Sequence, residues 1–180
     1  EEHRGDDRSP QLSGHFRLSY FRAMRSALII AVLIGCSAQK PTDTSFVHDV
    51  ESVLDAPIEA RFDSLFQAHE ARTGNEITLV THPTFNGKAS KDFAVAFGDS
   101  VGVGKKDRNN GITIAFSKAK RQVFIATGSG MEKVLHDSIC QRIIDQEMLP
   151  GFKLEDHSAG LWAGCLAIVD FLDKPENRIP

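Results

Sequence analysis

The stretch that decides the fold consists of three apolar segments, which are EITLVT at residues 76–81, ITIAF at 112–116 and QVFIAT at 122–127. Each is rich in β-branched residues and predicts a strand. Residues 91–101 lie between the first two segments and repeat apolar residues at helical spacing. A strand–helix–strand unit favours parallel pairing with a right-handed connection, and the short turn at 117–120 favours an antiparallel third strand. We therefore expect a small mixed sheet.

Helices are expected on the faces of this sheet. Apolar residues recur at helical spacing in four segments, and a residue type that caps helices stands at the start of each. The candidate caps are Asp55, Ser90, Asp137 and Asp156. The pair Pro150-Gly151 is expected to end the third helix. An extended entry at residues 46–50 precedes the first helix. These elements predict a domain of the α/β class.

The N-terminal part of the chain has the features of an export signal. Met24 is the first methionine, and Arg25 and an apolar run at 27–34 follow it. The run is far shorter than the roughly 20 residues of a membrane-spanning helix, so it suits a secretory signal better. Its end, Leu33-Ile34-Gly35-Cys36, resembles the lipobox of bacterial lipoproteins, whose cysteine is lipidated. A buried strand with a chance Gly-Cys is the alternative, but it does not explain the Met-Arg start.

These signals divide the chain into five parts. Residues 1–23 are interpreted as an upstream extension outside the native protein, 24–35 as a lipoprotein signal peptide and 36–45 as a tether. Residues 46–174 form the expected domain, and 175–180 are a tail. Cys36 would then anchor the domain to membrane lipid without a span.

Composition excludes several classes of protein. The 180 residues include 21 Lys and Arg and 24 Asp and Glu, for a formal net charge of −3. That charge has the wrong sign for a protein that binds nucleic acid through bulk positive charge, so no nucleic-acid partner is expected. Apolar residues make up 41% and argue against a wholly disordered chain. Cys140 and Cys165 lie on apolar helix faces, which predicts buried thiols and leaves a disulfide open.

Strand order predicts a candidate site. The second strand starts and the third ends at the same end of the sheet, so the loops 102–110 and 128–137 should converge there. They carry five residues with side-chain oxygens, the ligand type that Ca²⁺ and Mg²⁺ prefer, namely Asp107, Asn109, Asn110, Glu132 and Asp137. Gly128 and Gly130 would let backbone segments approach closely. Plain turn chemistry is the alternative, with Asn-Asn-Gly starting a strand and Asp137 capping a helix.

An ordered series of short motifs points to a family. NNG at 109–111 is followed by GSGME at 128–132, VLHD at 134–137 and LPGF at 149–152. This order resembles the TPM domain family over nearly all of residues 46–173. The resemblance implies a three-layer α/β/α sandwich on a mixed sheet and an extracytoplasmic domain that is usually tethered to a membrane. Known roles include an acid phosphatase activity and an auxiliary subunit of a channel, and several members bind divalent ions.

Individual residues can be carried over from the family pattern. Asn110, Glu132 and Asp137 match the Asn-Gly, the Glu and the Asp that opens a helix. Asn109 stands where the family has Asp, which removes one charge, and Ser129 stands where it has Tyr. The resemblance therefore implies a divalent-cation site in which Asp107 could supply a nearby carboxylate.

Two functions follow, from different classes. The first is a non-catalytic, lipid-anchored module of the bacterial cell envelope, facing the periplasm or the surface, that binds an envelope protein and a Ca²⁺ or Mg²⁺ ion. The second is a metal-assisted phosphatase, in which the cation would polarise phosphate while Asp137, Asp107 or Glu132 positions water. No separate pair of nucleophile and base is evident in the sequence, which favours the first function.

Overall fold

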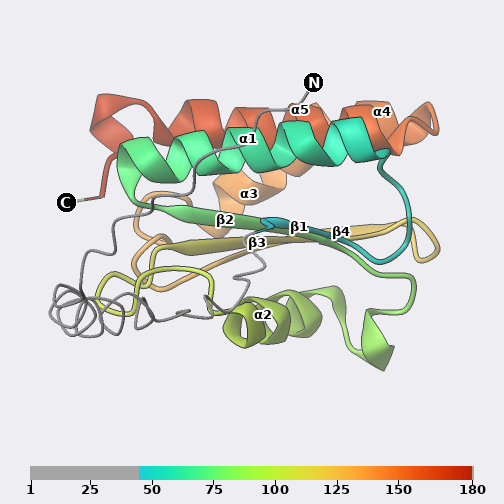
Figure 1. Cartoon of the computed structure of the whole chain (residues 1–180), viewed down its shortest axis with the longest axis horizontal. Coiled ribbons are helices and arrows are strands. Elements are labelled where there is room, and N and C mark those ends of the chain that lie inside the picture. Colours follow the sequence, from blue (N-terminus) through green and yellow to red (C-terminus); the bar gives the residue numbers. More distant parts are fainter. Residues whose placement is uncertain (1–44, 180) are drawn as a thin grey trace, which may run out of the picture. The chain divides into compact units, whose positions relative to one another are not determined.

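The computed structural model describes residues 45–179. The expected extension, signal peptide and lipidated Cys36 lie outside these residues, as does all of the tether except Ser45. A four-stranded sheet lies between two layers of helices in the described part of the chain (Figure 1). This is the predicted three-layer α/β/α sandwich. No helix within the described residues is long and apolar enough to cross a membrane.

The sheet is mixed and its strand order is β1-β2-β3-β4. The strands are β1 (Val47–Asp49), β2 (Glu76–Thr81), β3 (Gly111–Ser117) and β4 (Gln122–Thr127). β2 pairs parallel to β3 with Glu76 opposite Gly111, and β4 pairs antiparallel to β3 with Thr127 opposite Ile112. The predicted pairing is confirmed. The extended entry forms a further short strand, β1, which is parallel to β2.

The helices divide unequally between the two faces. They are α1 (Ala56–Thr73), α2 (Ser90–Val101), α3 (Asp137–Ile143), α4 (Leu149–Lys153) and α5 (His157–Leu172), with short turns η1 (Phe85–Gly87), η2 (Ile144–Met148) and η3 (Pro175–Asn177). α1, α3, α4 and α5 cover one face, and α2 covers the other (Figure 1). The smaller core under α2 is built on Val80, Phe93 and Ala115, and Phe85 of η1 completes it.

Only one of the four expected caps acts as a cap through its side chain. Asp156 accepts a hydrogen bond from the backbone N–H of Ala159 at 3.0 Å. Ser90 and Asp137 are instead the first helical residues of α2 and α3, and the side chain of Asp55 makes no cap bond before α1. A carboxylate in the first turn, as at Asp137, still interacts favourably with the helix dipole.

The prediction that Pro150-Gly151 ends the third helix is wrong. α3 runs into the π-helical turn η2 and then into α4, which contains both residues. Proline is tolerated because the wider π-helical turn η2 directly precedes it, which changes the bonding pattern at the position of the missing N–H. A Cβ at Gly151 would lie 2.6 Å from the backbone nitrogen of Gly160, so this glycine lets α4 approach α5 closely.

Candidate functional site at the loop end of the sheet

The two loops that the sequence places together do meet. The N–H of Gly130 donates to the carbonyl of Asn109 at 3.0 Å, and the N–H of Gly128 donates to the carbonyl of Gly111 at 2.9 Å. Loop 102–110, which leads into β3, and loop 128–137, which follows β4, therefore lie side by side. This part of the molecule is called the loop end below.

Glycine permits the close approach of these loops. A Cβ built on Gly130 would meet the carbonyl oxygen of Arg108, and one built on Gly128 would meet the carbonyl oxygen of Asn109. Both contacts would be far shorter than real Cβ atoms tolerate. The two positions need glycine because of space and not because of a left-handed backbone.

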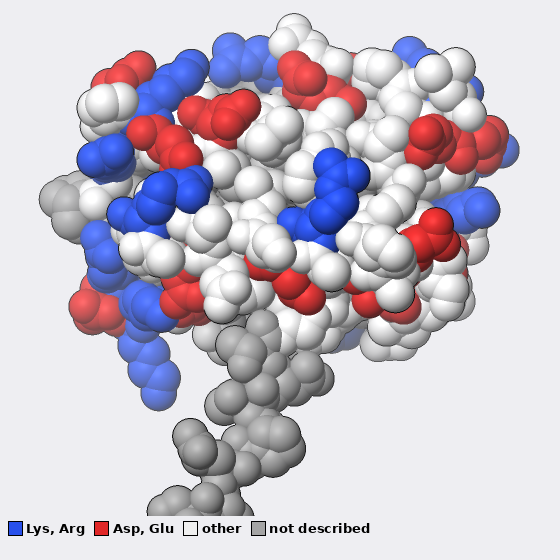
Figure 2. Space-filling view, turned by 45° about the horizontal axis from the view of Figure 1, so that its top comes forward, with Lys and Arg blue, Asp and Glu red and all other residues white. Residues whose placement is uncertain are grey.

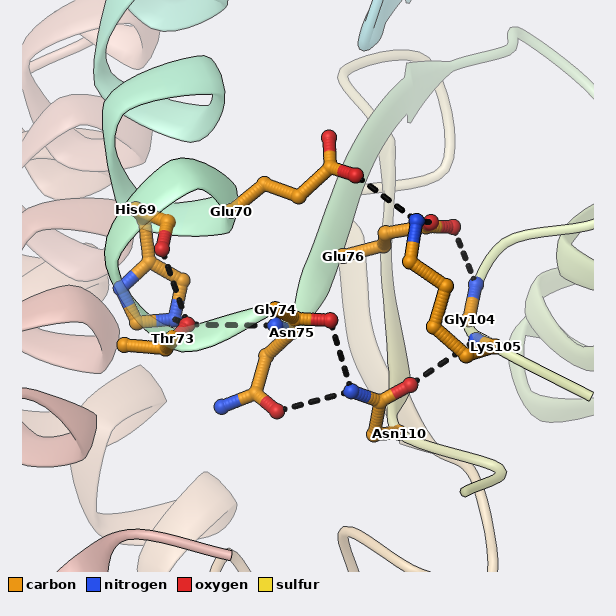
Figure 3. A network of polar contacts seen from close by, with 9 residues as sticks. All are labelled: His69, Glu70, Thr73, Gly74, Asn75, Glu76, Gly104, Lys105 and Asn110. Carbon is orange, nitrogen blue, oxygen red and sulfur yellow. Dashed lines mark hydrogen bonds and ion pairs between the residues drawn. The ribbon is translucent and has the colours of Figure 1, made fainter. Parts of the chain in front are cut away.

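The buried side chain of Asn110 links the segments of the loop end by hydrogen bonds. The residue is fully buried, and its Nδ2 donates to the carbonyl of Gly74 at 2.8 Å and to Oδ1 of Asn75 at 2.9 Å (Figure 3). Its Oδ1 accepts the backbone N–H of Lys105 at 2.9 Å. These bonds join the turn after α1, the start of β2 and loop 102–110. Asn110 is thus a positioning residue, because the nitrogen and the oxygen of its side-chain amide both already take part in hydrogen bonds.

Lys105 lies beside Asn110, and its amine is bound by two carboxylates. Nζ of Lys105 donates to Oε1 of Glu70 at 2.8 Å and also contacts Oε1 of Glu76 (Figure 3). Oε2 of Glu76 accepts the backbone N–H of Gly104 at 2.6 Å. The bonds to Glu70 and then to Glu76 raise the pKa of Lys105, so this amine stays protonated. Sequence reasoning missed this network, since its members come from α1, β2 and the loop with no motif between them.

The predicted carboxylate ligands do not form a cluster. Asp107, Glu132 and Asp137 are exposed, and no hydrogen bond or ion pair of their side chains is found within residues 45–179. The described residues also contain no group of three or more His, Cys, Asp or Glu side chains that could hold a metal ion.

Asn109 lies in a hollow that the sequence did not predict. Its backbone has a φ of 47°, in the left-handed region. The hollow has a volume of about 230 Å³ and lies where β3 starts and β4 ends. Its polar lining consists of Asp99, Asn109, Thr113, Thr127 and Ser129, and Gly128 forms part of its wall. Every one of these five side chains offers an oxygen atom.

Three candidate nucleophiles, two thiols and one hydroxyl, are poorly prepared for catalysis. Burial raises the pKa of the Cys140 thiol to about 12 and raises that of Cys165 as well, so neither forms a thiolate readily. Both thiols are free and buried, as the sequence predicts. Oγ of Ser138 lies 2.9 Å from Nδ1 of His136, but this is an exposed contact between residues two positions apart. No carboxylate contacts that histidine in the described part of the chain.

A second polar contact ties α1 to the end of α5. His69 is fully buried, and its Nδ1 lies 3.0 Å from Oδ1 of Asp173. Arg72 donates to the other oxygen of Asp173 at 2.7 Å. Burial lowers the pKa of His69, and Asp173 opposes this effect in part. The histidine is therefore a packed structural residue, neutral over most of the physiological range.

A comparison with known families agrees with the motif series. A model of the TPM domain family matches residues 47–171 of this chain. The chain belongs to the TPM domain family. TPM domains are extracytoplasmic. A comparison with curated proteins found no match.

Solved structures similar to this TPM domain include proteins from three bacteria. The N-terminal domain of a P. gingivalis protein is 28% identical, with a TM-score of 0.69 over 76% of this chain and 87% of that one. BA42 from Bizionia argentinensis is 19% identical, with a TM-score of 0.59 over 71% and 90%. The N-terminal domain of cg2496 from Corynebacterium glutamicum is 14% identical, with a TM-score of 0.56 over 70% and 78%. The last two establish a likeness of fold.

The surface of this TPM domain carries mixed charge on the face shown in Figure 2. Lys and Arg side chains are interspersed there with Asp and Glu, with uncharged areas between them. This pattern is ordinary for a globular domain.

Proposed function

We propose that this TPM domain is a membrane-tethered, non-catalytic module of the bacterial cell envelope. It binds an envelope protein and holds a divalent cation at the loop end. The observation that carries the proposal is the hollow beside Asn109, where two loops meet and where five of the lining residues have a side-chain oxygen. Calcium and magnesium are bound through oxygen, so the donor chemistry fits these ions.

The residues that would hold the ion are those that line the hollow, Asp99 of α2 and Asn109 of loop 102–110. The exposed carboxylates of Asp107 and Glu132 lie on the two loops outside this lining, and they would attract the ion by their charge. Asn110 would act indirectly, by fixing loop 102–110 through its three hydrogen bonds. A bound cation would supply positive charge that draws the loops together and presents a defined surface to a partner.

Calcium titration of the ¹⁵N-labelled protein tests the cation. We expect saturable shifts of amide signals at 107–110 and 128–137, with weaker binding after Asp107→Asn combined with Glu132→Gln. Asp92→Asn is the matched control, because it removes an exposed carboxylate from the first turn of α2, at the other end of that helix from Asp99. Signals that do not move at millimolar Ca²⁺ or Mg²⁺ would refute the cation site.

Hydrolysis of p-nitrophenyl phosphate tests the non-catalytic assignment. We expect no turnover with Ca²⁺ or Mg²⁺ present. Activity that co-purifies with the protein and disappears in Asp137→Ala, but persists in Asp92→Asn, would instead establish the metal-assisted phosphatase.

Mass spectrometry of protein extracted from bacterial membranes tests the tether. We expect an N-terminal lipid on Cys36, and loss of both the lipid and membrane fractionation in Cys36→Ala. An unlipidated wild-type N-terminus would exclude the anchor. Crosslinking of the anchored wild-type protein in membranes, followed by identification of the captured proteins, tests for the envelope partner.

A further inference from the structure

The outer edge of β4 is open for pairing. β4 is the last strand in the sheet order, so only one of its sides meets β3. The bond from Gly128 N–H to the Gly111 carbonyl identifies a hydrogen-bonded pair of the antiparallel ladder. Such pairs alternate with non-bonded ones, so the backbone groups that point away from β3 are those of Val123, Ile125 and Thr127.

This edge lacks the usual protection against strand addition. Within residues 45–179, no hydrogen bond satisfies the N–H or the carbonyl of these three residues. The strand QVFIAT contains no proline and no charged residue, which are the common blocks on an edge. Val123 and Thr127 are partly exposed, while the side chain of Ile125 packs in the core.

We propose that β4 pairs antiparallel with β4 of a second copy of this chain and joins the two sheets into one. In this register Ile125 lies opposite the partner's Ile125, and Val123 lies opposite the partner's Thr127. All of the outward-facing backbone groups are then paired across a two-fold axis. The inference does not depend on the cation or on the tether.

The distribution of charge favours a second copy in antiparallel orientation as the occupant. The hairpin tip before β4 exposes three basic side chains, Lys118, Lys120 and Arg121. Two carboxylates lie against the tip, Glu51 on its backbone N–H groups and Glu155 at 3.9 Å from Arg121, so the tip keeps a net positive charge. The other end of β4 leads to the exposed carboxylates of Glu132 and Asp137, and loop 128–137 contains one lysine, Lys133, and no arginine. Antiparallel pairing brings each basic tip to the partner's acidic loop, whereas parallel pairing would place like charges together.

Two hollows lie beside β4, one near each end of the strand. One of about 300 Å³ has Val123 and Phe152 among its lining residues, and Thr127 lines the hollow of about 230 Å³. An interface built on one strand is small, so we expect a weak dimer that dissociates on dilution.

Proline substitution at the edge tests the pairing. Thr127→Pro removes an N–H that points outward and leaves the ladder to β3 intact, while Thr127→Val keeps the N–H. Sedimentation velocity of the purified protein over a concentration series should show a monomer–dimer equilibrium for wild type and Thr127→Val, with the dissociation constant raised at least tenfold in Thr127→Pro. A wild type that stays monomeric at the highest soluble concentration would overturn the proposal, as would a dimer that is equally strong in Thr127→Pro.

Charge exchange tests the orientation and does not depend on the folding of the proline variant. The double variant Lys118→Glu with Lys120→Glu should lose the dimer, and so should Glu132→Lys. An equimolar mixture of these two proteins should form a heterodimer, because both tip–loop contacts are then complementary: the reversed tip meets the reversed loop, and the unchanged tip meets the unchanged loop. A mixture that remains monomeric would exclude the antiparallel register. Intermolecular NOEs between Val123 and the partner's Thr127, in a mixed labelled and unlabelled wild-type sample, would support it directly.

Discussion

The side-chain amide of Asn110 donates to the side-chain oxygen of Asn75 at 2.9 Å, and both residues are buried. This bond joins the residue before β3 to the residue before β2, so it fixes where two parallel strands start. The loop end is therefore held by a buried polar contact and not by apolar packing alone.

Loss of this contact should destabilise the whole domain. Asn110→Ala removes three hydrogen bonds and leaves the Gly74 carbonyl and the Lys105 N–H without their partner. We expect a decrease of about 3 kcal/mol in the free energy of unfolding, measured by urea denaturation. Lys106→Ala, a change at an exposed position of the same loop, should have almost no effect. Equal stabilities of the two variants would show that the hydrogen bonds of Asn110 do not contribute to the free energy of unfolding.

The two carboxylates around Lys105 should differ in their effect on stability. The side chain of Glu76 also accepts the backbone N–H of Gly104, whereas among residues 45–179 the side chain of Glu70 is bonded only to the lysine. Glu76→Gln should therefore lower the free energy of unfolding by about 1 kcal/mol, and Glu70→Gln by a few tenths. Thermal unfolding at low and high salt distinguishes them, because an exposed ion pair weakens with salt. A larger loss in Glu70→Gln would contradict this ranking.

Gly130 should not tolerate a side chain. Gly130→Ala places a methyl group against the carbonyl oxygen of Arg108 and forces the two loops apart. We expect a loss of about 2 kcal/mol, together with amide shifts confined to the loop end. Ser129→Ala is the neighbouring control and should leave both stability and spectrum nearly unchanged. A fully stable Gly130→Ala protein would mean that the loops separate without cost.

The buried histidine should make stability depend on pH. The pKa of His69 lies below its ordinary value of 6.5 in the folded protein, mainly because of burial. As the pH falls below 6.5, the unfolded chain takes up a proton that the folded chain resists, so the free energy of unfolding decreases. One group contributes a slope of at most about 1.4 kcal/mol per pH unit.

Urea denaturation at several pH values measures this slope. His69→Gln should have a flatter profile below pH 6.5 than wild type. His136→Gln changes an exposed histidine and should keep the wild-type slope. The same slope in wild type and His69→Gln would show that another group titrates.

The local pattern of the amino-acid sequence was enough to predict the pairing of most of the sheet. The alternation of β-rich segments and one amphipathic helix predicted the parallel pairing of β2 with β3 and the antiparallel addition of β4. The path of the chain at Pro150 was not predictable in this way, because proline ends a helix unless a preceding wide turn accommodates it. The caps were also ambiguous, since Ser90 and Asp137 suit a first turn as well as a cap.

The candidate site was predictable only at the level of the backbone. Strand directions placed loops 102–110 and 128–137 together, and their mutual hydrogen bonds agree with that placement. The partners of individual side chains depend on distant segments, such as Glu70 of α1 beside Lys105. The sequence did not indicate Asp99 as a candidate site residue either, because Asp99 belongs to the site only through the hollow that the folded loops create.

The C-terminal segment has a practical bearing on how this protein is handled. Nη2 of Arg108 lies 3.3 Å from the carbonyl of Ile179, so the end of the described chain is fastened to loop 102–110. A fluorescent label, affinity handle or following domain joined at this terminus would emerge next to the loop end and could shield it from calcium or from a partner. Labels for the experiments above belong at the opposite end of the sheet, for example at the exposed Lys91 in the first turn of α2.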